Sequence, residues 1–157
     1  MQDPKALFDI WFVQPLKSLE AIPNGAGAFI ALATSCFLYE RYADAAIREA
    51  GSQYTVEKQL MIDFNISEET AREFWTIMRN GILHKGMPKK KDRGKNLSGW
   101  RFEGEFTQAI KLDKTNGSFQ ELQVQPWLFM NKVIELWQDN IDLIDRNESF
   151  PWARIVD

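Results

Sequence analysis

Apolar side chains recur three and four residues apart in several separate stretches of this chain, and this spacing constrains the fold most strongly. The clearest stretch begins at Pro126 and continues to about Arg146. Its apolar positions are Trp127, Met130, Ile134, Trp137, Ile141 and Ile144. Residues at this spacing share one face of an α-helix, which must pack against other helices. The pattern is typical of a seam in a helix bundle.

Two further helices are predicted in the N-terminal third. Asp3 and Pro4 form a helix start, because aspartate caps free amides and proline suits the first helical position. This helix is expected to reach Glu20, with a kink or a break near Pro15. After a turn, a long helix is expected over residues 27–50, where the following glycine ends it.

Two shorter helices follow. One is predicted from Val56 to Phe64. The next begins after Ser67, whose hydroxyl can cap the free amides, and two glutamates follow at the positive end of the helix dipole. Gly86 is expected to end it. The apolar face of this helix carries Ala71, Phe74, Trp75, Met78 and Ile82.

The remaining segment indicates a loop and then strands. Residues 89–99 are expected to form a loop. Asn116-Gly117 lies between two alternating apolar pairs and indicates a hairpin. A three-residue loop, 116–118, is preferred over a two-residue loop because it sets Leu112 opposite Leu122, and Ile110 opposite Val124.

The predicted fold is therefore mainly α. We expect an up-and-down bundle of four to five helices, with a small β-hairpin at about residues 100–125 inserted before the last helix. Residues 1–157 are expected to form a single domain.

Cysteine content and hydropathy favour a cytoplasmic protein. Cys36 is the only cysteine, and its apolar helical setting favours a buried small side chain over a reactive thiol. Neither a secretory signal nor a membrane-spanning stretch is apparent, so no membrane contact is expected. Six tryptophans and eleven phenylalanines are many for 157 residues, and some are expected to serve an interface such as a homodimer.

The segment from Arg79 to His84 is the strongest candidate for chemistry. His84 is the only histidine, and histidine transfers protons near neutral pH. Arginine holds phosphate through a two-pronged contact. On a regular helix Asn80 and His84 lie about 40° apart, but Arg79 and His84 lie about 140° apart. Either the helix loosens around Gly81 and Gly86, or two copies face each other across a dimer. The sequence leaves both open.

A basic strip follows this segment. Between residues 85 and 95 there are six basic side chains and one acidic one, although the whole chain has a net charge of −3. The candidate phosphate-binding residues are Lys85, Lys89, Lys90, Lys91, Arg93 and Lys95. A solvated loop with no ligand is the alternative. Trp100 and Phe102 come next and can stack on unpaired bases, although the inward face of a strand is the favoured interpretation.

Arg79-Asn80-x-x-x-His84, at the end of an amphipathic helix, resembles the R-x4–6-H motif of the HEPN superfamily. Proteins of this superfamily are small helical bundles, often dimeric, and many are metal-independent endoribonucleases of toxin–antitoxin, CRISPR-related or anti-phage defence systems. The resemblance implies that Arg79 and His84 are catalytic, and that Asn80 is the polar residue common after the arginine. No cofactor and no metal ion is implied.

The resemblance therefore implies cleavage of RNA by its own 2′-OH, with His84 as general base or acid and Arg79 stabilising the developing charge. Asn80 would orient a phosphate oxygen or the imidazole. An antitoxin or a defence-system protein is a further expected partner. The alternative is a non-catalytic HEPN-like module that binds nucleotide or RNA, or regulates a partner. A purely structural helix end is the third interpretation. The pair Glu40-Arg41 could position His84, although an exposed ion pair is favoured.

Overall fold

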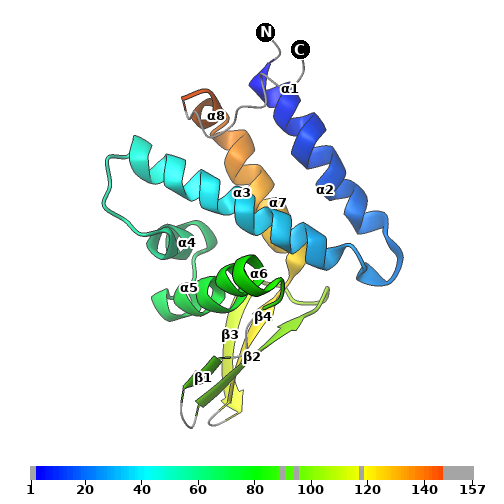
Figure 1. The fold of residues 1–157 in the computed structure, drawn as a ribbon, viewed down its shortest axis with the longest axis vertical. Coiled ribbons are helices and arrows are strands. Elements are labelled where there is room, and N and C mark those ends of the chain that lie inside the picture. Colours follow the sequence, from blue (N-terminus) through cyan, green and yellow to red (C-terminus); the bar gives the residue numbers. More distant parts are fainter. Residues whose placement is uncertain (1–2, 89–90, 94–95, 117–118, 147–157) are drawn as a thin grey trace. The chain divides into compact units, whose positions relative to one another are not determined.

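The computed structural model describes residues 3–88, 91–93, 96–116 and 119–146. Figure 1 shows a mainly helical chain with a small β-sheet, as the sequence predicts. The chain divides into two compact units. Unit 1 combines residues 1–53 with residues 130–157, and unit 2 comprises residues 54–129. Of the helices in the described ranges, none has the length and apolarity that crossing a membrane requires.

Unit 1 begins with a helical run whose pitch changes along its length. Its successive parts are α1 (Pro4–Phe8), the π-helical turn η1 (Asp9–Val13), α2 (Gln14–Ser18) and the 3-10 turn η2 (Leu19–Ala21). The Asp3 side chain accepts from the Lys5 amide at 3.1 Å, which confirms the predicted cap. The π-helical turn ends two residues before Pro15, as expected because proline has no amide hydrogen and its ring crowds the carbonyl four residues earlier, which lies within this turn.

A second helix, α3 (Ala28–Glu49), follows the 3-10 turn η3 (Pro23–Gly25). Its bounds agree with the prediction to within one residue at each end. Gly51 has a φ of 58°, the left-handed conformation expected where a glycine ends a helix. Cys36 is buried in α3, as predicted.

The predicted last helix is divided in the structure. α7 (Pro126–Asp139) and α8 (Asp142–Arg146) are separated by a turn in which the Asn140 amide bonds to the Trp137 carbonyl at 3.2 Å. The prediction of one continuous helix is therefore wrong at residues 140–141, whereas the predicted end at Arg146 is confirmed. Asn140 explains the break, because its side chain also donates to the Leu136 carbonyl at 2.9 Å and competes with the helical pattern.

The core of unit 1 is organised around Trp137. Its indole Nε1 donates to the Leu38 carbonyl at 2.9 Å. Its ring centroid lies 5.6 Å from that of Tyr42 and 6.0 Å from that of Phe8. Trp137 thus joins α1, α3 and α7, and it satisfies its only polar group while the ring is buried.

Unit 2 begins with two capped helical segments. α4 (Val56–Phe64) has the predicted bounds, and the second segment consists of α5 (Glu68–Phe74), the π-helical turn η4 (Trp75–Arg79) and α6 (Asn80–Lys85). The Ser67 hydroxyl accepts from the Thr70 amide at 3.2 Å, so the predicted cap is confirmed. Gly86 ends the segment with a φ of 69°, also as predicted.

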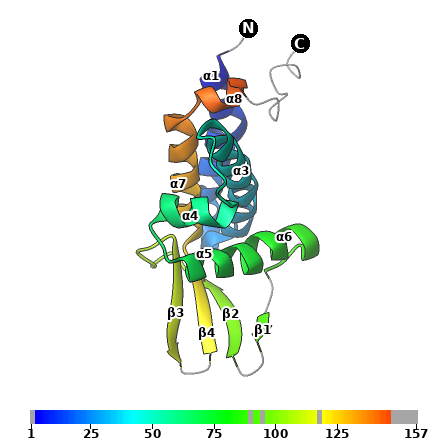
Figure 2. The ribbon, with the colours of Figure 1, turned by 90° about the vertical axis from the view of Figure 1, so that its left-hand side faces the viewer.

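The sheet of unit 2 is larger than the predicted hairpin. Its strands are β1 (Lys91–Arg93), β2 (Asn96–Phe102), β3 (Ile110–Asn116) and β4 (Phe119–Val124). Figure 2 shows them in the order β1-β2-β4-β3, in which β2 and β4 are parallel and the other neighbours antiparallel. The prediction of a loop over residues 89–99 is therefore wrong for the described residues, since β1 pairs with β2 there.

The β3–β4 register is the predicted one. Leu112 lies opposite Leu122, and Ile110 lies opposite Val124. The predicted three-residue loop is wrong, because Asn116 pairs with Phe119 after a register shift within β3. Residues 117–118 of that loop lie outside the described residues.

The two faces of the sheet differ in polarity. Ile110, Leu122 and Val124 are buried on one face, where α5 packs against β3 and β4. An ion pair between Lys114 and Glu69 also joins β3 to α5. Neighbouring residues of a strand point to opposite sides, so the residues between the buried ones lie on the opposite face. Their side chains are polar. These polar residues are Arg101, Lys111, Asp113, Glu121 and Gln123.

Candidate functional site

The segment that carries Arg79 and His84 contains a wide turn, but not between these two residues. The Asn80 amide bonds to the Trp75 carbonyl five residues earlier, which makes Trp75–Arg79 a π-helical turn. From Asn80 to Lys85 the backbone is a regular α-helix. Of the two alternatives that the sequence left open, loosening of the helix is therefore not observed, since Gly81 lies inside α6 and Gly86 follows its end.

A regular helix between Arg79 and His84 keeps their side chains apart. Five α-helical residues correspond to a rotation of about 140° around the helix axis. One copy of this helix does not direct both side chains at one small group. Of the three predicted catalytic residues, the structure brings together Arg79 and Asn80.

Arg79 is held by two neighbours. Its Nη1 donates to Asn80 Oδ1 at 2.8 Å, and its guanidinium carbon lies 5.4 Å from the centroid of the Trp75 ring. The Trp75 ring is itself buried, so it is a fixed platform for the guanidinium. The sequence prediction assigned Trp75 only to the apolar face. Its position four residues before Arg79 was the available signal for this contact.

His84 is exposed in the last turn of α6, and Lys85 beside it is exposed too. The Gly86 amide bonds to the Ile82 carbonyl at 2.9 Å. This helix end is thus closed by the glycine, as in many helices, and the closure does not require the imidazole. His84 is accessible to a ligand approaching from solvent.

The predicted basic strip is only partly described. Lys91 and Arg93 lie in β1, opposite Ser98 and Asn96 of β2. Lys89, Lys90 and Lys95 lie outside the described residues. The hypothesis that these residues bind phosphate stays a prediction.

Trp100 and Phe102 stand on the same face of β2, because they are two residues apart. Their ring centroids are 4.9 Å apart. Trp100 keeps 36% of its surface exposed, whereas Phe102 is half-buried. The sequence favoured an inward-facing position for both rings. The burial of Phe102 fits this interpretation better than that of Trp100, which is more exposed.

Glu40 and Arg41 lie on α3 of unit 1, whereas His84 belongs to unit 2. Together with Phe37 and Asp44 they line an open hollow along α3. A role of this pair in positioning His84 stays a prediction. Within the described ranges, no group of three or more histidine, cysteine, aspartate or glutamate side chains is arranged to hold a metal ion.

The geometry of unit 2 thus provides an exposed imidazole and a firmly held guanidinium on different sides of one helix. Comparison of the chain with family models, with curated proteins and with solved structures finds no match.

Proposed function

We propose that this protein is a metal-independent endoribonuclease of the HEPN type, and that two copies of the chain complete each active site. The observation that carries the proposal is that one helical segment bears an exposed His84 and, five residues earlier, an Arg79 held by Asn80 and Trp75. The regular helix between the two residues supports a site shared by two subunits, since Arg79 of one copy can then meet His84 of the other.

The proposed reaction is an internal transfer within RNA. His84 accepts the proton of the 2′-OH, and the 2′ oxygen attacks the adjacent phosphorus. The bond to the 5′ oxygen breaks, and this oxygen takes a proton from water and leaves as a 5′-OH, while His84 returns its proton to water. The other product end is a 2′,3′-cyclic phosphate. Arg79 stabilises the negative charge that grows on the phosphate oxygens in the transition state.

Exposed apolar side chains support association of two copies. Ile10, Trp11, Ile30 and Phe37 of unit 1 are each more than 40% exposed. Ile30 and Phe37 are seven residues apart in α3 and so lie on one face of that helix, which a partner copy could cover. A bundle of the HEPN type, a homodimer and a cytoplasmic location belong to the same proposal, together with an antitoxin or defence-system partner.

The direct test is cleavage of labelled RNA by purified protein in the presence of EDTA. We expect cleavage to persist and to leave a 2′,3′-cyclic phosphate. His84→Ala should abolish it, and thermal unfolding of the variant should match that of the unaltered protein. Retained cleavage by a folded His84→Ala variant would exclude His84 as the proton acceptor.

A non-catalytic RNA-binding module is the second candidate. The Arg79 contacts favour this candidate. A guanidinium that bonds to Asn80 and stacks on Trp75 has a structural role, which does not require that Arg79 take part in catalysis. This candidate gives no product under any condition. Its RNA binding weakens with salt and is lost when Lys89, Lys90 and Lys91 are neutralised together.

A further inference from the structure

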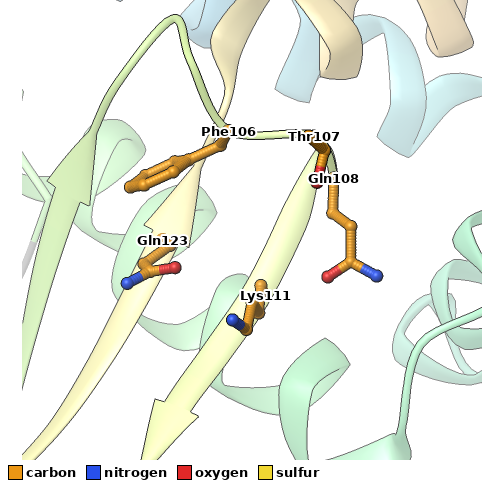
Figure 3. Close-up of a pocket in the computed structure, with 5 residues that line it drawn as sticks. All are labelled: Phe106, Thr107, Gln108, Lys111 and Gln123. Carbon is orange, nitrogen blue, oxygen red and sulfur yellow. The ribbon is translucent and has the colours of Figure 1, made fainter.

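A second site in unit 2 arises from the connection between β2 and β3. Residues 103–109 cross the end of β4, where the Glu103 amide donates to the Val124 carbonyl at 3.3 Å and the Gln125 amide to the Ala109 carbonyl at 3.0 Å. The Gln125 side chain also donates to the Gly104 carbonyl at 3.1 Å. These bonds hold the connection beside the polar face of the sheet. A pocket of about 100 Å³ lies there, lined by Phe106, Thr107, Gln108, Lys111 and Gln123 (Figure 3).

Gln123 supplies a hydrogen-bond acceptor of fixed orientation. Its side chain is only 7% exposed, and its Nε2 donates to Glu121 Oε1 at 3.0 Å and to Asp113 Oδ2 at 3.3 Å. Ionised carboxylates only accept hydrogen bonds, so the amide nitrogen must face them. The amide oxygen is therefore left as the group that Gln123 offers to a ligand. Figure 3 shows this oxygen on the side toward Lys111.

Phe106 supplies a flat surface that is held in place. The guanidinium carbon of Arg101 lies 5.2 Å from the centroid of the Phe106 ring. Arg101 is itself anchored, since its Nε lies 3.1 Å from Glu121 Oε1 and its Nη1 lies 3.6 Å from Glu103 Oε2. An aromatic ring supported in this way is suited to stacking with another planar ring.

The size of the pocket and the acceptor that Gln123 presents restrict its ligand. At about 100 Å³ the pocket is smaller than a closed cavity of about 150 Å³ that holds one benzene ring, so it receives a single six-membered ring only because it is open to solvent. The carboxylates of Asp113 and Glu121 accept hydrogen bonds from the amide nitrogen of Gln123, and Glu121 is paired with Arg101. The acceptor oxygen of Gln123 favours a ligand with an amino group over one with a carbonyl oxygen at that position.

We propose that this pocket binds one unpaired cytosine base of RNA. The base stacks on Phe106, its exocyclic amino group donates to Gln123 Oε1, and exposed Lys111 donates to an acceptor of the ring. Uracil carries a carbonyl oxygen in place of the amino group, and this oxygen would face the Gln123 oxygen, which is also an acceptor. The proposal rests on the proposed function in one respect, namely that RNA is the ligand, and it names cytosine-containing single strands as the substrate class.

The test measures binding without cleavage. The protein carries His84→Ala, and the probes are fluorescent oligoadenylates that contain one central cytosine or one central uracil. We expect the cytosine probe to bind about tenfold more tightly by fluorescence anisotropy at fixed salt. Phe106→Ala and Gln123→Leu should each remove this preference. The matched control is Gln138→Leu, which alters an exposed glutamine of α7 and should keep it.

Each outcome decides the proposal. Equal affinity for both probes would overturn the cytosine pocket while leaving RNA binding, and hence the proposed function, intact. A preference unchanged in folded Phe106→Ala and Gln123→Leu would also overturn it, because another site would then read the base. A preference lost in both variants supports the pocket even if the unaltered protein fails to cleave RNA, and that failure would reject only the nuclease.

Discussion

At the scale of single residues, two arginine side chains are each held in place by a neighbouring polar side chain and an aromatic ring. Arg79 bonds to Asn80 and stacks on Trp75, and Arg101 bonds to Glu121 and stacks on Phe106. Both guanidinium groups thus lose rotational freedom in the free protein. A ligand that uses either position pays less ordering entropy on binding.

The carboxylate of Glu69 gives a pH-dependent prediction at this scale. The hydrogen bond from Lys114 is the main reason that the pKa of Glu69 lies below its ordinary value of 4.5. A carboxyl group with a lowered native pKa stabilises the fold above its unfolded pKa, and this stabilisation is lost as the pH falls through the native pKa. Glu69→Gln should therefore lower the free energy of unfolding at about pH 7, by less than about 1 kcal/mol because the pair is accessible to solvent.

Urea unfolding at about pH 7 and about pH 3 measures this effect. The loss caused by Glu69→Gln should shrink at the lower pH. Glu68→Gln is the matched control, since Glu68 occupies the same first turn of α5 without the Lys114 contact. An equal loss at both pH values, or an equal loss in the control, would contradict the assigned role of the ion pair.

At the scale of elements, the sequence correctly predicted the helix caps, the helix ends and the strand register that depend on residues close together in the chain. The caps at Asp3 and Ser67 and the ends at Gly51 and Gly86 were predictable, because each depends on one residue type next to a helix. The β3–β4 register was predictable because it sets Leu112 opposite Leu122, and Ile110 opposite Val124, on one face of the sheet.

The missed elements depend on contacts that are distant in sequence or on backbone detail. β2 pairs in parallel with β4, more than twenty residues later in the chain, so no hairpin signal announces it. The π-helical turn Trp75–Arg79 has no proline directly after it, unlike the turn before Pro15, so no residue type in the sequence marks its position. The candidate site was therefore predicted as a set of residues, but its geometry was not.

Gly27 gives a prediction for the element that it begins. A Cβ at this position would lie 2.9 Å from the Leu19 Cβ and closer still to the Leu19 carbonyl oxygen. Gly27→Ala should therefore displace the backbone between η2 and α3 and lower the free energy of unfolding by roughly 1–3 kcal/mol. Gly104→Ala is the control, because no atom lies within 4 Å of its added Cβ. Urea unfolding of both variants checks this, and a Gly27→Ala variant as stable as the control would contradict the close approach.

At the scale of the whole molecule, the central claim is that a single chain holds half of each active site. Arg79 and His84 are separated by a regular helix in unit 2, and unit 1 exposes apolar side chains suited to a partner copy. The sequence alone allowed a loosened helix as the other route to convergence. The α-helical backbone of Asn80–Lys85 removes that route, so the proposed nuclease requires two chains.

Mixing two inactive variants tests this claim most directly. Arg79→Ala and His84→Ala should each be inactive alone in an RNA cleavage assay. When equal amounts are coexpressed and assemble at random, half of the dimers contain one of each, and each such dimer regains one of its two sites. We therefore expect about a quarter of the unaltered activity in the mixture. A mixture as inactive as its components, from variants that fold and dimerise, would contradict an active site shared between subunits.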